Sequence, residues 1–156
     1  MSSIEPAACG GDLQPAADGI GPLYQRDYWA VIDRCRTTPS EVMTLILARF
    51  CEFPPAETVT FTRETNPASP LEVGDELDIA IRLAGPCRVR VIHRDACSVT
   101  LGTLEGHPEA GRITFGAYRN EDGSVIFHIR SRARSSSGFR YAGFMAGGEA
   151  MQTTTW

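Results

Sequence analysis

Residues 101–115 read LGTLEGHPEAGRITF, and this stretch decides how the second half of the chain is organised. A run with apolar side chains at every second position enters the stretch, and a similar run leaves it. Between them, His107-Pro108-Glu109 reads as a turn, because proline fixes φ and lacks an N–H donor. The stretch therefore predicts two antiparallel strands that are neighbours in a sheet.

The same alternation continues on both sides of this stretch. The predicted strands lie near residues 28–36, 58–63, 77–83, 88–91, 99–103, 113–117 and 125–129. Asn120-Glu121-Asp122-Gly123 reads as a hairpin connection between the last two strands. Strict alternation over consecutive strands predicts an antiparallel sheet with one buried face.

One helix is signalled by Thr38-Pro39-Ser40-Glu41. Threonine can cap the exposed N–H groups, proline suits the first helical position, and glutamate can close a capping box. Apolar residues follow at helical spacing up to Phe50, and prolines at 54 and 55 end the helix. The predicted fold class is α+β, with a curved antiparallel sheet of six to seven strands wrapped around this helix.

Composition bounds the domain organisation and the class of protein. Residues 1–22 lack periodicity and predict a mobile arm, and residues 23–156 predict one α+β domain that ends in a loop and a short helix. A net charge of −4 argues against nucleic-acid binding. No apolar run approaches the ~20 residues of a membrane span, and the first residues lack a secretory signal, so we expect a cytoplasmic protein. The five scattered cysteines contain no C-x-x-C pair, and neither a metal nor a cofactor is predicted.

The pattern GTL-x-GH-x-x-x-G, formed by residues 102–111, resembles the domain-of-unknown-function family 1990 (DUF1990), some members of which are described as auxin-binding-like. The resemblance covers residues 35–152, with further support from residues 70–74 and 123–131. One departure is Arg112-Ile113, where such proteins often carry acidic residues. The order of elements also resembles the helix-grip class of START-like and pollen-allergen-like domains, which implies a curved sheet around a cavity.

His107 is the most prominent candidate site residue, since Glu105 and Glu109 flank it two residues away on each side. A histidine beside carboxylates can act as a general base. Pro108 interrupts the extended geometry that would bring the three side chains to one face. The alternative interpretation is a wide turn that starts at Pro108, in which the histidine bonds a loop carbonyl.

The leading functional hypothesis is a binding domain that holds a small apolar or amphipathic molecule between the sheet and the C-terminal segment. Its candidate ligand-binding residues are Glu105, His107, Glu109, Tyr118 and Arg130. The first alternative is a cyclase- or hydratase-like enzyme that uses His107 with Glu105 or Glu109. The second is an interaction protein that associates with itself, as a homodimer, through an exposed sheet edge and the aromatic C-terminal segment. The row Arg130, Arg132 and Arg134 suits either an anionic ligand or a protected sheet edge.

Overall fold

The computed structural model describes residues 11–32, 36–54, 57–63, 69–82 and 85–137. They form one seven-stranded antiparallel sheet with the strand order β1-β7-β6-β5-β4-β3-β2. The strands are β1 (Ile20–Ile32), β2 (Val59–Thr62), β3 (Glu76–Ile81), β4 (Gly85–Arg94), β5 (Ser98–Thr103), β6 (Glu109–Arg119) and β7 (Val125–Ser135). One α-helix, α1 (Pro39–Ala48), and two short 3₁₀ helices, η1 (Ala16–Asp18) and η2 (Phe50–Glu52), complete the described elements.

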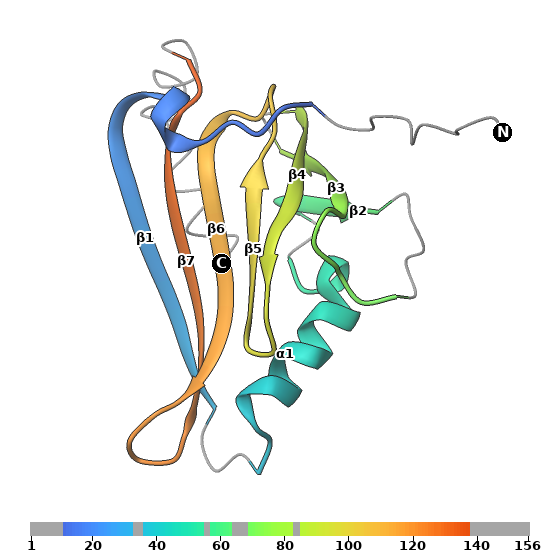
Figure 1. The fold of residues 1–156 in the computed structure, drawn as a ribbon, viewed down its shortest axis with the longest axis vertical. Coiled ribbons are helices and arrows are strands. Elements are labelled where there is room, and N and C mark those ends of the chain that lie inside the picture. The colour runs from blue at the N-terminus through green and yellow to red at the C-terminus, as the bar shows by residue number, and fades with distance from the viewer. Residues whose placement is uncertain (1–10, 33–35, 55–56, 64–68, 83–84, 138–156) are drawn as a thin grey trace, which may run out of the picture.

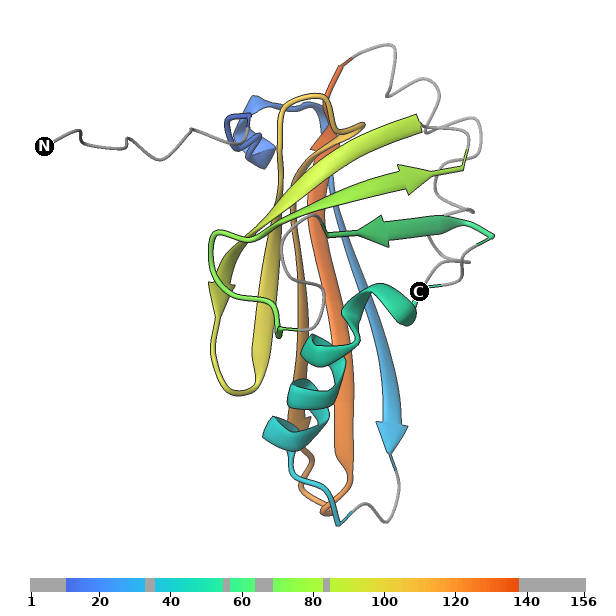
Figure 2. The same cartoon turned by 90° about the vertical axis from the view of Figure 1, so that its right-hand side faces the viewer.

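The sheet curves around α1, which lies on its concave side (Figures 1 and 2). The helix buries Met43, Ile46 and Leu47 against the apolar side chains that the strands present every second residue. The Phe50 ring meets the rings of Phe61 and Phe115 edge-on, with centroids 5.4 and 5.0 Å away. The α+β class and the curved sheet around one helix are thereby confirmed.

The predicted capping box at the start of α1 is present. The Glu41 N–H donates to Thr38 Oγ1 at 3.3 Å, and the Thr38 N–H donates to Glu41 Oε2 at 2.7 Å. Pro39 occupies the first helical turn, where its missing N–H has no cost. Local chemistry alone therefore fixes where this helix begins.

The N-terminal part of the domain differs from the sequence prediction. Residues 11–22 do not form an arm: Leu13 bridges Leu104, η1 follows, and β1 begins at Ile20. Of the strand predicted over residues 28–36, residues 28–32 form the last part of the longer strand β1, which pairs with β7 along most of its length. Residues 33–35 lie outside the described residues. Two other predictions lie outside the described residues: the first part of the arm, residues 1–10, and the loop and short helix after residue 137.

The register of β1, β7 and β6 sorts their side chains onto two faces. Tyr28 on β1 lies opposite Ile129 on β7, which lies opposite Phe115 on β6, and all three pack in or against the core under α1. Residues one position away along each strand point to the opposite side. We call the side that carries α1 the concave face and the other side the convex face.

Candidate functional site

The turn between β5 and β6 holds the predicted candidate His107. The reversal occurs at Glu105 and Gly106, not at Pro108, because Gly106 adopts a φ of +92°, a conformation that glycine tolerates. The His107 N–H donates to the Leu104 carbonyl at 3.1 Å. The predicted turn is therefore present, but it is centred two to three residues earlier than the sequence indicated.

The His107 side chain is only 7% exposed and takes part in the main-chain structure of this turn. The Glu109 N–H donates to His107 Nδ1 at 3.0 Å. Gln14 Nε2 donates to the carbonyl oxygens of His107 and Glu109, at 3.2 and 3.0 Å. The imidazole thus accepts a hydrogen bond within the turn, and the main-chain carbonyl groups of the turn bind Gln14 of the N-terminal segment, whereas Glu105 is exposed.

The five residues singled out from the sequence fall into two separate groups. Glu105, His107 and Glu109 lie at the start of β6, whereas Tyr118 lies near its other end. Eleven residues of extended strand span roughly 35 Å, so His107 and Tyr118 cannot share one small ligand. Arg130 on β7 belongs to the group of Tyr118, since both side chains lie on the convex face.

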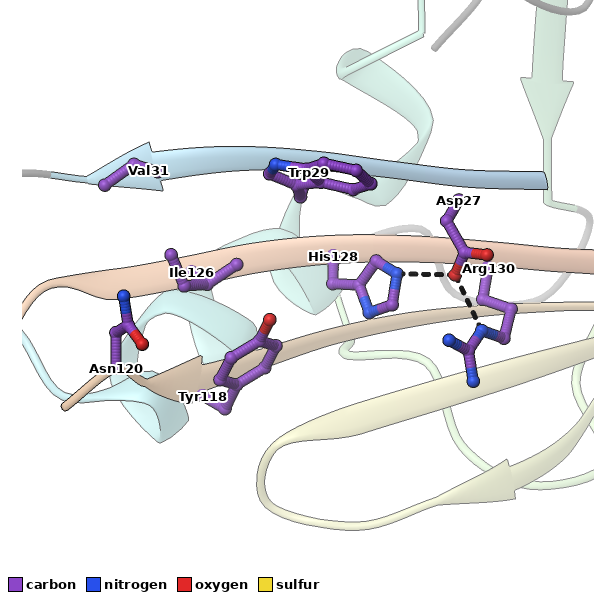
Figure 3. Close-up of a pocket in the computed structure, with 8 residues that line it drawn as sticks. All are labelled: Asp27, Trp29, Val31, Tyr118, Asn120, Ile126, His128 and Arg130. Carbon is purple, nitrogen blue, oxygen red and sulfur yellow. Dashed lines mark hydrogen bonds and ion pairs between the residues drawn. The ribbon is translucent and has the colours of Figure 1, made fainter.

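Tyr118 and Arg130 border a hollow of about 460 Å³ on the convex face (Figure 3). We call it the convex hollow, and it is lined by Asp27, Trp29, Val31, Tyr118, Asn120, Ile126, His128 and Arg130. All of these side chains except Asn120, which directly follows β6, come from β1, β7 and the end of β6, so neighbouring strands build most of the site. Sequence reasoning missed Asp27, Trp29 and His128, although each alternates with a residue of the core face.

An acidic group organises the charged end of the convex hollow. Asp27 Oδ1 accepts hydrogen bonds from Arg130 Nε at 2.6 Å and lies 2.8 Å from His128 Nε2. Gln25 Nε2 donates to the other oxygen at 3.2 Å. The hydrogen bond from Arg130, helped by those from Gln25 and His128, lowers the pKa of Asp27 from 3.8 to about 2 against the opposing effect of desolvation. The carboxylate is therefore ionised at neutral pH and holds Arg130 beside the hollow.

The other end of the convex hollow is aromatic. The rings of Trp29 and Tyr118 stand roughly perpendicular to the His128 ring, each with a centroid distance of 6.4 Å. Trp29 lies opposite His128 in the register, and His128 lies opposite Gly116 on β6. Because Gly116 has no side chain, nothing projects from β6 at the position opposite His128.

The concave face is an apolar wall interrupted by one polar layer. Across β1, β7 and β6, the layer of Tyr28, Ile129 and Phe115 is followed by the layer of Arg26, Ser131 and Ile113. Phe127 and Ile113 are partly buried and pack against the core. We call the surface formed by these strands on the side of α1 the concave wall.

Ser131 is the unusual member of the polar layer. Its side chain is 3% exposed, and within the described part of the chain its Oγ has no hydrogen-bond partner. Its neighbour Arg26 places its guanidinium carbon 4.9 Å from the centre of the Tyr24 ring. A buried hydroxyl without a partner is uncommon, because its desolvation is not compensated. The concave wall therefore offers a cation and an unused hydrogen-bonding group side by side.

In the described ranges, no three His, Cys, Asp or Glu side chains are arranged so that they can hold a metal ion. The same ranges contain no helix with the length and apolar character to cross a membrane.

Comparisons with known proteins give a family and a fold. The model of a family described as a domain of unknown function, DUF1990, matches residues 50–153. No curated protein sequence matches. A norcoclaurine synthase mutant from Thalictrum flavum, solved with a transition state analogue, is 11% identical with a TM-score of 0.55, over 86% of this chain and 91% of that one. Major latex-like protein 151 from Panax ginseng is 15% identical, with a TM-score of 0.47, and the match covers 87% of this chain and 99% of that one. The norcoclaurine synthase structure has the helix-grip fold, as the order of elements predicted for this chain.

Proposed function

This chain belongs to the DUF1990 family and has the helix-grip fold, and on that basis we propose that it is a binding domain for a small amphipathic molecule. In this proposal the molecule lies against the concave wall. The observation that carries the proposal is the polar layer in an otherwise apolar surface, where the buried hydroxyl of Ser131, without a partner among the described residues, lies beside the Arg26 cation.

The chemistry of the concave wall defines the class of ligand. Binding sites for small molecules are mostly apolar, with a few polar groups that fix orientation. Tyr28, Phe127 and Ile113 offer the apolar part. Ser131 Oγ can donate or accept a hydrogen bond, and Arg26 favours an anionic or strongly accepting group. The ligand expected from these groups has an apolar body and a carboxylate or a similar acceptor.

The fold analogy supports the same class of function. The norcoclaurine synthase structure is a complex with a transition state analogue, so a protein of this fold can hold a small organic molecule. The alternative of an enzyme that uses His107 as an acid–base group has less support. The imidazole is nearly buried, and its Nδ1 accepts a hydrogen bond from the main chain of the same turn.

The proposal is tested with cis-parinaric acid, a fluorescent fatty acid with an apolar chain and one carboxylate. We expect the full-length protein to bind it. We expect Arg26→Met to weaken binding roughly 10-fold, since a hydrogen bond to a charged group contributes about 1.5–3 kcal/mol. Arg26→Lys should restore part of the loss, because it keeps the charge.

A matched control separates the concave wall from general effects of charge. Arg49→Met removes an exposed arginine at the end of α1 and should leave the affinity unchanged. Native mass spectrometry of protein purified from its own host gives an independent reading, and we expect a co-purified small molecule. Absence of parinarate binding, or equal affinity of the wild type and Arg26→Met, would refute the proposal.

A further inference from the structure

The convex face carries a pair of like charges that the proposed function does not use. Arg112 on β6 lies directly opposite Arg132 on β7. Among the described residues, neither guanidinium has an ion-pair partner. The third strand offers no compensation, because Gln25 on β1, opposite Arg132, is neutral. Like charges directly opposite each other destabilise a strand pair, so this arrangement favours an external anion.

The arginine pair is continuous with the charged end of the convex hollow. Arg132, Arg130 and His128 alternate along β7 and share the convex face. Successive residues on one face of a strand are roughly 7 Å apart, so the Arg132 position lies about 7 Å from that of Arg130 and about 13 Å from that of His128. Asp27 binds Arg130 through Nε, and the described contacts leave the terminal nitrogens of this guanidinium for another partner.

The aromatic end of the hollow is open to a flat molecule. The Trp29 side chain is 67% exposed and Tyr118 is 50% exposed, which is high for large aromatic residues. Both project beside His128, and Figure 3 shows Tyr118 and Trp29 on either side of that ring. Exposed aromatic side chains around an open space provide stacking surfaces at little cost in conformational entropy.

We propose that the convex face is a second binding site, for a flat aromatic molecule that carries a phosphate or carboxylate group. The aromatic part lies in the convex hollow against Trp29 and Tyr118. The anionic group binds the guanidinium groups of Arg130, Arg132 and Arg112. Within the described residues, Asp27 is the one carboxylate that forms an ion pair with any of these three arginines, so this end of the face keeps a positive charge that an anion can neutralise.

The test compares 1-naphthyl phosphate with 1-naphthol, which has the same ring system without the phosphate. Isothermal titration calorimetry of the full-length protein should give an affinity at least ~10-fold higher for the phosphate. In two-dimensional NMR spectra, the indole N–H signal of Trp29, assigned through Trp29→Phe, should shift on addition of either compound. Inorganic phosphate alone should leave this signal in place.

Two variants test the role of the arginines. The double variant Arg112→Gln/Arg132→Gln should remove most of the preference for 1-naphthyl phosphate over 1-naphthol, because Arg130 is then the last of the three arginines left to bind the phosphate. Arg49→Gln, on the side of α1, should not change the affinity for either compound. The double variant and the wild type should bind cis-parinaric acid with the same affinity. Binding at the concave wall and binding at the convex face are therefore tested independently.

Three results would overturn the second site. The first is equal affinity for the two naphthyl compounds in the wild type. The second is a Trp29 signal that does not move. The third is tighter binding of a single-stranded RNA oligonucleotide that shifts the same signal and depends on the same arginines, because it would identify the face as a nucleic-acid surface.

Discussion

Replacing Ser131 by alanine should stabilise the ligand-free protein. The Ser131 side chain is 3% exposed and its Oγ lacks a hydrogen-bond partner among the described residues. Burial of a hydroxyl without a compensating bond costs about 1–3 kcal/mol in proteins. Alanine keeps Cβ and removes only the oxygen, so the loss of packing is small. We expect the free energy of unfolding to rise by about 1 kcal/mol, and Tm by about 2–4 °C.

Thr103 provides the matched comparison, because its buried hydroxyl is fully used. Its side chain is 8% exposed; Oγ1 donates to the Gln14 carbonyl at 2.9 Å and accepts from the Gly111 N–H at 3.0 Å. Thr103→Val keeps the shape and removes the hydroxyl, which leaves these two partners unsatisfied. We expect the free energy of unfolding to fall by about 1–3 kcal/mol.

Urea unfolding followed by circular dichroism measures both variants under the same conditions, with linear extrapolation to water. The Ser131→Ala experiment is then repeated with cis-parinaric acid. Ligand stabilises the native state in proportion to its affinity, so the advantage of the variant should shrink if Ser131 binds the ligand. A loss of 1 kcal/mol or more in ligand-free Ser131→Ala would refute the reasoning, because it would mean that the hydroxyl has a stabilising partner.

Three further predictions concern the fold and the convex hollow. Thr38→Ala should lower the free energy of unfolding by about 1 kcal/mol through loss of the helix cap, whereas Thr38→Ser should be nearly neutral in urea unfolding. Gly111→Ala should cost at least ~2 kcal/mol, because its Cβ would lie 2.1 Å from the Arg132 carbonyl oxygen; a near-native Tm would contradict this close approach. Because the folded-state pKa of Asp27 is lowered from 3.8 to about 2, its bonds to Arg130 and neighbours stabilise the protein above pH 4, and this contribution is lost as the pH falls from about 4 to 2. The Tm of Asp27→Asn, measured by thermal unfolding between pH 2 and 5, should lack this part of the pH dependence. Identical profiles of Tm against pH for the variant and the wild type would contradict the prediction.

The sequence by itself determined the features that depend on near neighbours. The capping box at Thr38 and Glu41 involves residues three positions apart, and it begins α1 where the pattern predicted. Alternation of apolar side chains involves residues two positions apart, and it predicted an antiparallel sheet with one buried face. The resemblance carried by residues 102–111 also led to the correct family.

The tertiary structure alone decided which residues meet. The extent of β1 depends on hydrogen bonds to β7, about a hundred residues away along the chain. The contact between the N-terminal segment and the turn at His107 depends on the side chain of Gln14, which donates a hydrogen bond to the His107 carbonyl. Alternation says that two residues share a face, but it does not say which strand lies beside them. The register that places Ser131 beside Arg26, and Gly116 beside His128, comes from pairing between distant strands. Both candidate sites follow from that register, because periodicity is a local property of a chain whereas a binding site is formed by contacts between remote segments.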